Sequence, residues 1–318
     1  MRPQISNMKK RIHQKIIDSI RKSTPLFLRQ LIGPVLAELF YLDRIYIRPN
    51  QKKPIILSLE QTIEKIKKEK LSVIRFGDGE IFIIDGGDLM FQHYNKDLAL
   101  QLEEIIKSDD PNLLICVPGI WNKLNQFEDY ASRFIKHQLY RYKSVWGQIL
   151  TNKKVYGDAY FSRNYLSYKD KSKSGEIFTK IFTLWEKEKV ILIEGEKSRL
   201  GVGNDLFDNV TSLERILAPA ENAYSRRQEI MREVEKHSKD KMILLSLGPA
   251  AKVIAYNLFK QGYRVIDIGH IDMEYEMYLR KSYKQVAVPY KYFNEIHARN
   301  PEDCKDKVYL SQIIKKVV

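Results

Sequence analysis

Residues 242–268, MILLSLGPAAKVIAYNLFKQGYRVIDI, decide the fold that the sequence predicts. The stretch begins with an apolar run from Met242 to Leu247 and ends with a second one from Arg264 to Ile268, and helical periodicity from Ala250 to Gln261 lies between them. A strand, a helix and a strand of these lengths form a βαβ unit with parallel strands. Both strands are apolar at nearly every position, which is typical of strands buried on both faces of a sheet.

The same alternation continues toward the N-terminus. Three more pairs of a helix and an apolar strand are expected at 57–70 and 71–76, at 97–108 and 113–117, and at 176–188 and 190–194. A further helix is expected from Ser225, with Gln228 completing a capping box. The sequence therefore predicts an α/β fold with a Rossmann-like, mainly parallel sheet flanked by helices.

The formal net charge of +14 is concentrated in an N-terminal extension. Residues 1–53 contain twelve Lys or Arg against three acidic residues, a net charge of +9, so the remaining 265 residues carry only +5. No zinc-finger spacing, RNA-binding aromatic motif or basic zipper accompanies this charge, and we therefore expect no nucleic-acid partner. We divide the chain into a basic helical extension, 1–53, and a main α/β domain, 54–318.

The extension has the periodicity of two short amphipathic helices, with Ile12, Ile16 and Ile20 on one face of the first. Such a helix packs either on protein, here the main domain or a second copy in a homo-oligomer, or on an anionic membrane surface. The chain has no signal-peptide pattern and no apolar run of about 18 residues, so a cytoplasmic location is expected, with peripheral contact at the inner face of the cell membrane as the alternative. Cys116 and Cys304 form no Cys-x-x-Cys pair, which argues against a disulfide framework or a thiolate zinc site.

The strand at 71–76 leads into Phe-Gly-Asp-Gly-Glu, which presents Arg75, Asp78 and Glu80 at the sheet edge where open α/β folds bind ligands. In an extended turn, residues two apart face the same side, so both carboxylates are expected to reach one point. Two carboxylates together with diphosphate and water oxygens suit Mg²⁺ or Mn²⁺, and Arg75 is expected to pair with a phosphate. Taken alone, this pattern is more typical of a surface turn than of a metal site.

A glycine-rich segment follows the strand at 190–194. Its glycines let backbone amides approach a ligand, and its polar side chains add donors, although the spacing matches neither a Walker loop nor a dinucleotide fingerprint. The candidate nucleotide- or phosphate-binding residues are Glu194, Glu196, Ser198, Arg199, Gly201, Gly203, Asn204 and Asp205. The alternative is a glycine-rich connection with solvated charges.

Two further segments offer binding groups. Gly248 and Pro249 open the helix of the βαβ unit, and free amides at a helix N-terminus attract a diphosphate. Asp158 and Arg163 flank an aromatic stretch, to which they add a carboxylate and a guanidinium, and they are candidate nucleotide-binding residues. A strand-to-helix turn needs glycine in any case, and aromatic residues usually pack in the core.

The segment 267–276 follows the last strand of the βαβ unit and is rich in polar side chains. His270, Asp272 and Glu274 are candidates for the base that accepts a proton from a hydroxyl. Helix capping by Asp272, with Glu274 favouring the first turn electrostatically, is the alternative.

Five of these segments, in this order, resemble the GT-D fold glycosyltransferases: RFGDGE, DAYFSR, EGEKSRLGVGNDL, SLGPAA and DIGHIDMEYE. The resemblance spans about residues 54–295. It implies a Rossmann-like sheet, a nucleoside diphosphate sugar donor such as UDP-glucose, and Mn²⁺ or Mg²⁺ held through an Asp-x-Glu motif that falls on Asp78 and Glu80. Family members act in the glycosylation of serine-rich surface adhesins and in gene clusters for other surface glycans, so the implied acceptor is a growing surface glycan or glycoprotein.

This resemblance leads to one hypothesis and two rivals. The chain is expected to be a metal-dependent glycosyltransferase. The first rival is a different nucleotide-dependent enzyme on the same kind of sheet. The second is a non-catalytic basic scaffold that joins a glycosylation complex through residues 1–53, and it predicts no nucleotide binding.

Overall fold

The computed structural model describes residues 54–119 and 124–317. The predictions for residues 1–53, namely the amphipathic helices, their membrane or protein contacts and the boundary at residue 53, lie outside the described residues. Residues 54–132 and 142–317 belong to one compact unit, and residues 133–141 belong to another, so the description below concerns the first unit.

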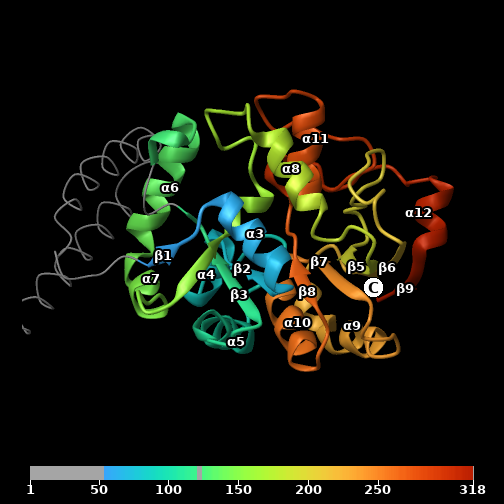
Figure 1. The fold of residues 1–318 in the computed structure, drawn as a ribbon, viewed down its shortest axis with the longest axis horizontal. Helices are drawn as coiled ribbons and strands as arrows, with labels where there is room; N and C mark the ends of the chain where they lie inside the picture. The colour runs from blue at the N-terminus through green and yellow to red at the C-terminus, as the bar shows by residue number, and fades with distance from the viewer. Residues whose placement is uncertain (1–53, 120–123, 318) are drawn as a thin grey trace, which may run out of the picture. The chain divides into compact units, whose positions relative to one another are not determined.

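A single parallel sheet forms the centre of this unit (Figure 1). Within the described residues its strands are β1 (Ile55–Ile56), β2 (Ser72–Arg75), β3 (Leu113–Val117), β4 (Val155–Asp158), β5 (Lys189–Gly195), β6 (Ser212–Ala218), β7 (Met242–Ser246), β8 (Val265–Asp267) and β9 (Ile313–Lys316). Their order across the sheet is β1-β4-β3-β2-β8-β7-β5-β6-β9, and every neighbouring pair is parallel. The predicted α/β fold with a parallel sheet is confirmed.

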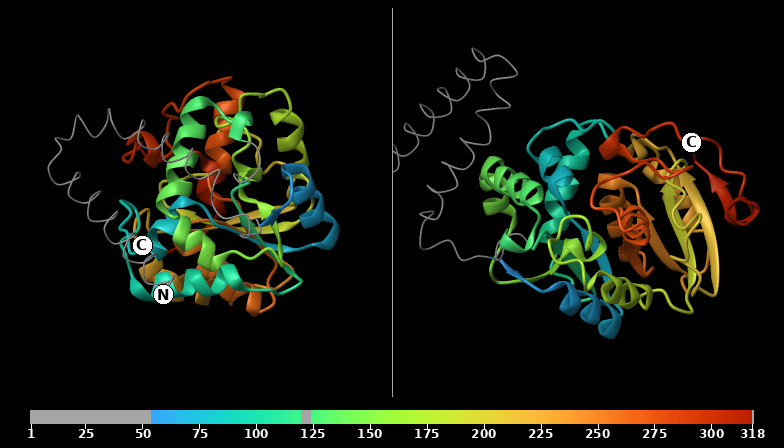
Figure 2. Two further views of the ribbon diagram at one scale, coloured as in Figure 1. Left: turned by 90° about the vertical axis from the view of Figure 1, so that its left-hand side faces the viewer. Right: turned by 90° about the horizontal axis from the view of Figure 1, so that it is seen from above.

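Helices cover both faces of the sheet (Figure 2). The helices are α3 (Leu59–Glu69), α4 (Asp78–Ile84), α5 (Lys96–Lys107), α6 (Asp129–Arg141), α7 (Lys143–Ile149), α8 (Ser174–Phe182), α9 (Arg227–Val234), α10 (Gly248–Lys260), α11 (Ile271–Leu279) and α12 (Lys307–Gln312), with 3₁₀ turns η1 (Leu124–Gln126), η2 (Ala159–Ser162), η3 (Ala223–Arg226) and η4 (Asn294–Ile296). The helices α3, α8 and α11 share one hydrophobic core with alternate strand residues, among them Val73 and Leu244. On the other face, α10 packs against α5 and α9, and α5 packs against α4. No helix in the described part of the chain is long and apolar enough to cross a membrane.

The sheet has a switch point between β2 and β8. These strands are neighbours, but the chain continues from β2 to β3 on one side, whereas β8 is preceded by β7 on the other side. Connections that leave neighbouring parallel strands in opposite directions open a crevice at the carboxyl ends of those strands. The segments that begin at Phe76 and Ile268 both start there.

One local prediction is wrong. The expected capping box of Ser225 and Gln228 does not form, because Ser225 lies in η3 and α9 starts only at Arg227. The Ser225 hydroxyl donates instead to the carbonyl of Asn222.

Candidate active site

The Asp-x-Glu motif lies at the start of a helix rather than in an extended turn. Gly77 is the extended N-cap of α4, and Asp78 is the first helical residue. The predicted extended turn is therefore wrong. Residues two apart on a helix point about 160° away from each other around its axis, so the two carboxylates leave α4 on different sides. Asp78 is exposed, whereas Glu80 is buried.

Glu80 belongs to a buried ion network. Its Oε2 accepts a hydrogen bond from the Gly77 amide at 2.7 Å, and its Oε1 lies 3.1 Å from Lys252 Nζ. Lys252 also lies 3.0 Å from Asp267 Oδ2. Burial alone would lower the pKa of Lys252, but Asp267 and Glu80 raise it above its usual value, so the ammonium stays charged. This network ties the start of α4 to α10 and β8.

Arg75 is also buried and faces protein groups. Its Nε and Nη2 donate to the carbonyl of Ala159 at 3.0 and 2.9 Å, and its backbone amide donates to Asp267 Oδ2 at 3.2 Å. A Cβ on Gly269 would lie 1.9 Å from Arg75 Nη1, so this turn requires glycine. In this arrangement Arg75 joins β2, η2 and β8 behind the exposed residues.

Four exposed or half-exposed polar residues at the switch point come from four different segments, and they are Asp78, Arg163, His270 and Glu295. Arg163, just after η2, donates from Nη2 to Glu295 Oε1 at 3.0 Å, and His270 Nδ1 lies 4.0 Å from the same oxygen. Burial would lower the pKa of Arg163, but the carboxylates of Glu295, Glu274 and Asp78 more than offset it and raise that pKa. Desolvation by the surrounding protein raises the pKa of the Asp78 carboxyl, and Arg163 opposes this rise. Asp78, Arg163, His270 and Glu295 therefore act on one another electrostatically at the switch point.

Two other predicted residues hold loops. Glu274 Oε2 accepts the amides of Tyr165 and Leu166 at 3.2 and 3.0 Å, and burial raises the pKa of its carboxyl. Asp158 Oδ1 accepts the amides of Gly119 and Tyr160 at 3.0 and 2.9 Å. Burial raises the pKa of Asp158 to about 7.

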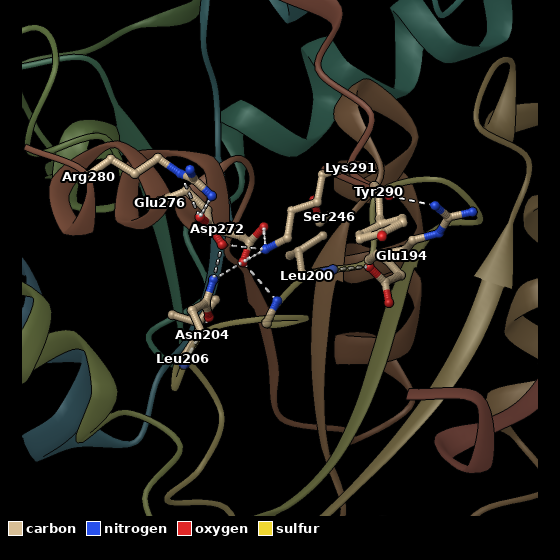
Figure 3. Close-up of polar contacts among 12 residues, drawn as sticks. Glu194, Leu200, Asn204, Leu206, Ser246, Asp272, Glu276, Arg280, Tyr290 and Lys291 are labelled. Carbon is tan, nitrogen blue, oxygen red and sulfur yellow. Dashed lines mark hydrogen bonds and ion pairs between the residues drawn. The ribbon is translucent and has the colours of Figure 1, made fainter. Parts of the chain in front are cut away.

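Asp272 fastens the glycine-rich segment to α11 (Figure 3). Its Oδ1 accepts the Gly201 amide at 2.8 Å and Asn204 Nδ2 at 2.9 Å. Lys291 Nζ reaches both oxygens of Asp272, at 2.9 and 2.8 Å, and Glu276 Oε1 at 2.9 Å. Asp272, Glu276 and Lys291 are all buried, so this network fixes the loop from the side of α11.

The rest of the glycine-rich segment is held mostly by its own polar residues. Glu194, which is buried, accepts the Leu200 amide at 2.7 Å and pairs with Arg215 at 2.5 Å. Arg199 donates to the carbonyl of Tyr290 at 2.6 Å, and Asp205 accepts the Tyr275 hydroxyl at 2.6 Å. The segment also contains the half-exposed residues Glu196 and Ser198, and Gly203, whose Cβ position is open.

Gly248 and Pro249 open α10 at the same edge of the sheet. Gly248 has φ +53°, and a Cβ there would lie 2.9 Å from the Phe91 ring. Its carbonyl accepts from Lys252 Nζ at 3.1 Å, and the neighbouring Ser246 hydroxyl donates to the carbonyl of Gly269 at 2.9 Å. The N-terminus of α10 is therefore locked to the segment that carries His270.

Of the two carboxylates in the Asp-x-Glu motif, Asp78 is the one that fits direct binding of a divalent cation. Within residues 54–119 and 124–317, no three His, Cys, Asp or Glu side chains form a metal-binding group. The exposed Asp78 carboxylate fits an Mg²⁺ or Mn²⁺ ion that takes its other ligands from diphosphate and water. Both oxygens of Glu80 already have partners, one of them an ammonium group, so Glu80 fits a supporting role behind Asp78.

The predicted site did not include Lys252, Asp267, Lys291 or Glu295, which also belong to this region. Lys252 follows Gly248 by four residues, and helical periodicity could have placed it one turn above the N-terminus of α10. Lys291 and Glu295 lie in a segment without periodicity, which gives no sequence signal for their contacts.

Known proteins share this fold and sequence. Residues 73–296 match the model of the family described as glycosyltransferase GT-D fold. The chain is 33% identical over 283 residues to the glycosyltransferase GlyD of Streptococcus pneumoniae serotype 4, and 35% identical over 268 residues to the probable glycosyl transferase Gly of Streptococcus gordonii. These matches cover 87% and 84% of this chain but only 35% and 39% of the two relatives.

The solved structures agree with these matches. A structure described as a new glycosyltransferase (DUF1792) from Streptococcus sanguinis superposes with a TM-score of 0.80 at 34% identity, over 84% of this chain and 100% of the other. A second, described as the domain of unknown function 1792 with a distinct glycosyltransferase fold, gives a TM-score of 0.79, again at 34% identity, over 84% of this chain and 96% of the other. The chain belongs to the family of glycosyltransferases with the GT-D fold.

Proposed function

We propose that this chain transfers a hexose from a nucleoside diphosphate sugar, such as UDP-glucose, to a hydroxyl of a growing surface glycan or glycoprotein. The family supports sugar transfer as the reaction. The observation that carries the proposal is the exposed Asp78 carboxylate, which shares the switch point with Arg163 and His270. A cationic side chain beside an exposed carboxylate suits a diphosphate bound together with a divalent cation.

The donor end of the site must stabilise a leaving diphosphate. A bound Mn²⁺ or Mg²⁺ at Asp78 would supply positive charge to that leaving group. Arg163 is half-exposed and keeps its charge, so it is the side chain best placed to add a hydrogen bond to the same oxygens. Arg75, Arg199 and the Gly201 amide already have protein partners, and in this proposal they shape the site.

The acceptor hydroxyl must lose its proton as its oxygen bonds to the sugar carbon and the bond from that carbon to the diphosphate breaks. For an inverting transfer, His270 is the strongest of the three candidate bases. It is half-exposed, and burial lowers the pKa of its imidazole, so a neutral ring with a free lone pair predominates near neutral pH. Asp272 and Glu274 are buried and accept hydrogen bonds from loop amides, which favours positioning roles for them.

The test is turnover of a panel of nucleoside diphosphate sugars, measured as release of the nucleoside diphosphate with and without Mn²⁺. The wild type should release it from at least one UDP-sugar, and Mn²⁺ should increase the rate. The Asp78→Asn variant should lose at least about tenfold in kcat/KM, because the substitution removes the anionic ligand while nearly preserving shape.

Asp240→Asn is the matched control. Asp240 is an exposed carboxylate that precedes β7, at the opposite end of that strand, where it pairs with Lys189. This variant should behave as the wild type does. Absence of turnover with every nucleotide sugar, or equal activity of Asp78→Asn and the wild type, would contradict the proposal.

A further inference from the structure

The segment from Tyr290 to Ala298 carries a carboxylate into the candidate active site and is fixed at both ends. Near its start, Lys291 binds the buried carboxylates of Asp272 and Glu276, and the Tyr292 amide donates to the carbonyl of Lys197 at 2.8 Å. At its end, Phe293 and Ala298 exchange two backbone hydrogen bonds, of 2.8 and 3.0 Å. The turn η4 between these anchors presents Glu295.

Glu295 lies between two candidate functional side chains. One of its oxygens, Oε1, is 3.0 Å from Arg163 Nη2 and 4.0 Å from His270 Nδ1. Only 27% of the Glu295 side chain is accessible to solvent, so the ion pair lies partly out of water. We propose that Glu295 is a positioning residue that holds the Arg163 guanidinium and the His270 imidazole close to one carboxylate oxygen.

This contact has a consequence for each partner. The Asp78 carboxylate also raises the pKa of Arg163. The ion pair of Arg163 with Glu295 keeps the guanidinium from pairing with Asp78 and from blocking the Asp78 carboxylate. For His270, a carboxylate facing Nδ1 favours the tautomer with the proton on Nδ1 and the lone pair on Nε2. The role in the reaction rests on the proposed function, whereas the contact itself does not.

The charges around His270 make the contact measurable. Burial lowers the pKa of the imidazole, Glu295 raises it, and the cationic groups of Arg163, Arg75 and Lys252 lower it. Burial would raise the pKa of Glu295, but His270 and Arg163 lower it to about 2, so the carboxylate is charged throughout the physiological range. Removing this one anion should therefore lower the pKa of His270.

The experiment compares Glu295→Gln, which keeps the shape but removes the charge, with Glu295→Asp, which keeps the charge on a shorter side chain. Glu104→Gln, on the exposed face of α5, is the control. The pKa of His270 is measured by NMR on histidine-labelled full chain, and its signal is identified as the one missing in His270→Asn. The kcat–pH profile and the KM for the UDP-sugar are measured on the same proteins.

Glu295→Gln should lower the pKa of His270 by about one unit, shift the acidic limb of the kcat–pH profile to lower pH by a similar amount, and reduce kcat about tenfold or more. Glu295→Asp should fall between this variant and the wild type, and Glu104→Gln should match the wild type. An unchanged pKa of His270 in Glu295→Gln overturns the proposed contact. A shifted pKa with unchanged kcat overturns its role. A wild type that turns over no nucleotide sugar contradicts the proposed function but leaves the NMR result to decide the contact.

Discussion

Asp158 shows what burial does to a single carboxyl group. It caps η2 through the Tyr160 amide and holds the Gly119 amide, and burial raises its pKa to about 7. The folded state therefore holds the proton more firmly than the unfolded chain does, in which the pKa is about 3.9. The stability that this group confers is complete below about pH 4 and is lost as the pH rises through about 7.

The Asp158→Asn variant should be more stable than the wild type at pH 8, by on the order of 2–4 kcal/mol. The amide oxygen can accept both hydrogen bonds, which in the wild type end on one oxygen, without carrying a buried charge. The advantage should shrink toward zero near pH 4. Urea unfolding of both proteins at several pH values measures this, and a stability difference that does not change with pH would show that Asp158 titrates normally.

At this scale the sequence predicts the neighbourhood of a residue better than its orientation. It identifies the start of α4 as a site, but Asp78 and Glu80 diverge because helical geometry begins one residue after Gly77. For Asp272 it indicates two alternatives, a catalytic base and a helix cap. In the structure the Asp272 carboxylate instead accepts a hydrogen bond from the Gly201 amide. The position of Glu295 depends on contacts across the fold, with Arg163 and His270, which no local pattern encodes.

Among the elements, the glycine-rich segment offers a matched pair of glycines. Gly201 and Gly203 both have positive φ, +77° and +80°. A Cβ on Gly201 would lie 2.6 Å from the Phe207 ring, whereas a Cβ on Gly203 would meet no atom within 4 Å. Substitution of Gly201 is therefore disfavoured by both side-chain packing and backbone conformation, whereas substitution of Gly203 is disfavoured by backbone conformation alone.

Gly203→Ala should cost about 1 kcal/mol of unfolding free energy from the backbone alone. Gly201→Ala should cost about 2–4 kcal/mol, because the Phe207 ring must also move. Chemical denaturation of both variants measures the difference. Equal losses of unfolding free energy in the two variants would mean that the Phe207 ring moves away from a Cβ at position 201 without a loss of stability.

The contact between this segment and α11 depends on Lys291. The Lys291→Met variant should lose about 3–5 kcal/mol of stability, because it leaves Asp272 and Glu276 buried without their shared cation. Lys284→Met, at an exposed position nearby, should change stability by less than about 0.5 kcal/mol. A loss in Lys291→Met no larger than that in the control would show that the network adjusts around the missing charge.

The buried elements are also the ones that the sequence predicts well. The strands β3 and β7 lie within one residue of their expected ranges, since each is almost entirely apolar and is followed within two residues by a glycine. Strand β6 was not predicted, because Glu214 and Arg215 interrupt its apolar pattern. Arg215 is accommodated there by an ion pair with the buried Glu194 on β5, a contact that becomes visible only when the sheet is assembled.

At the scale of the whole molecule, strand order determines where the chemistry lies. The sequence predicts parallel strands, but it does not place β2 beside β8, because the segments that pair are nearly two hundred residues apart in the chain. That pairing brings Asp78 and His270 to one switch point. The chain spans just over a third of the length of the curated relatives it matches. In our proposal, donor binding belongs to the residues that match the family model, 73–296.

Donor binding is therefore the most direct test of the central claim. Isothermal titration of UDP into the full chain in the presence of Mn²⁺ should show saturable binding that weakens when Mn²⁺ is omitted. The Asp78→Asn variant should bind at least about tenfold more weakly, equivalent to about 1.4 kcal/mol, and Asp240→Asn should bind as the wild type does. No binding of UDP with Mn²⁺, or equal affinity in the wild type and Asp78→Asn, would contradict the assignment of Asp78 to a diphosphate-metal site.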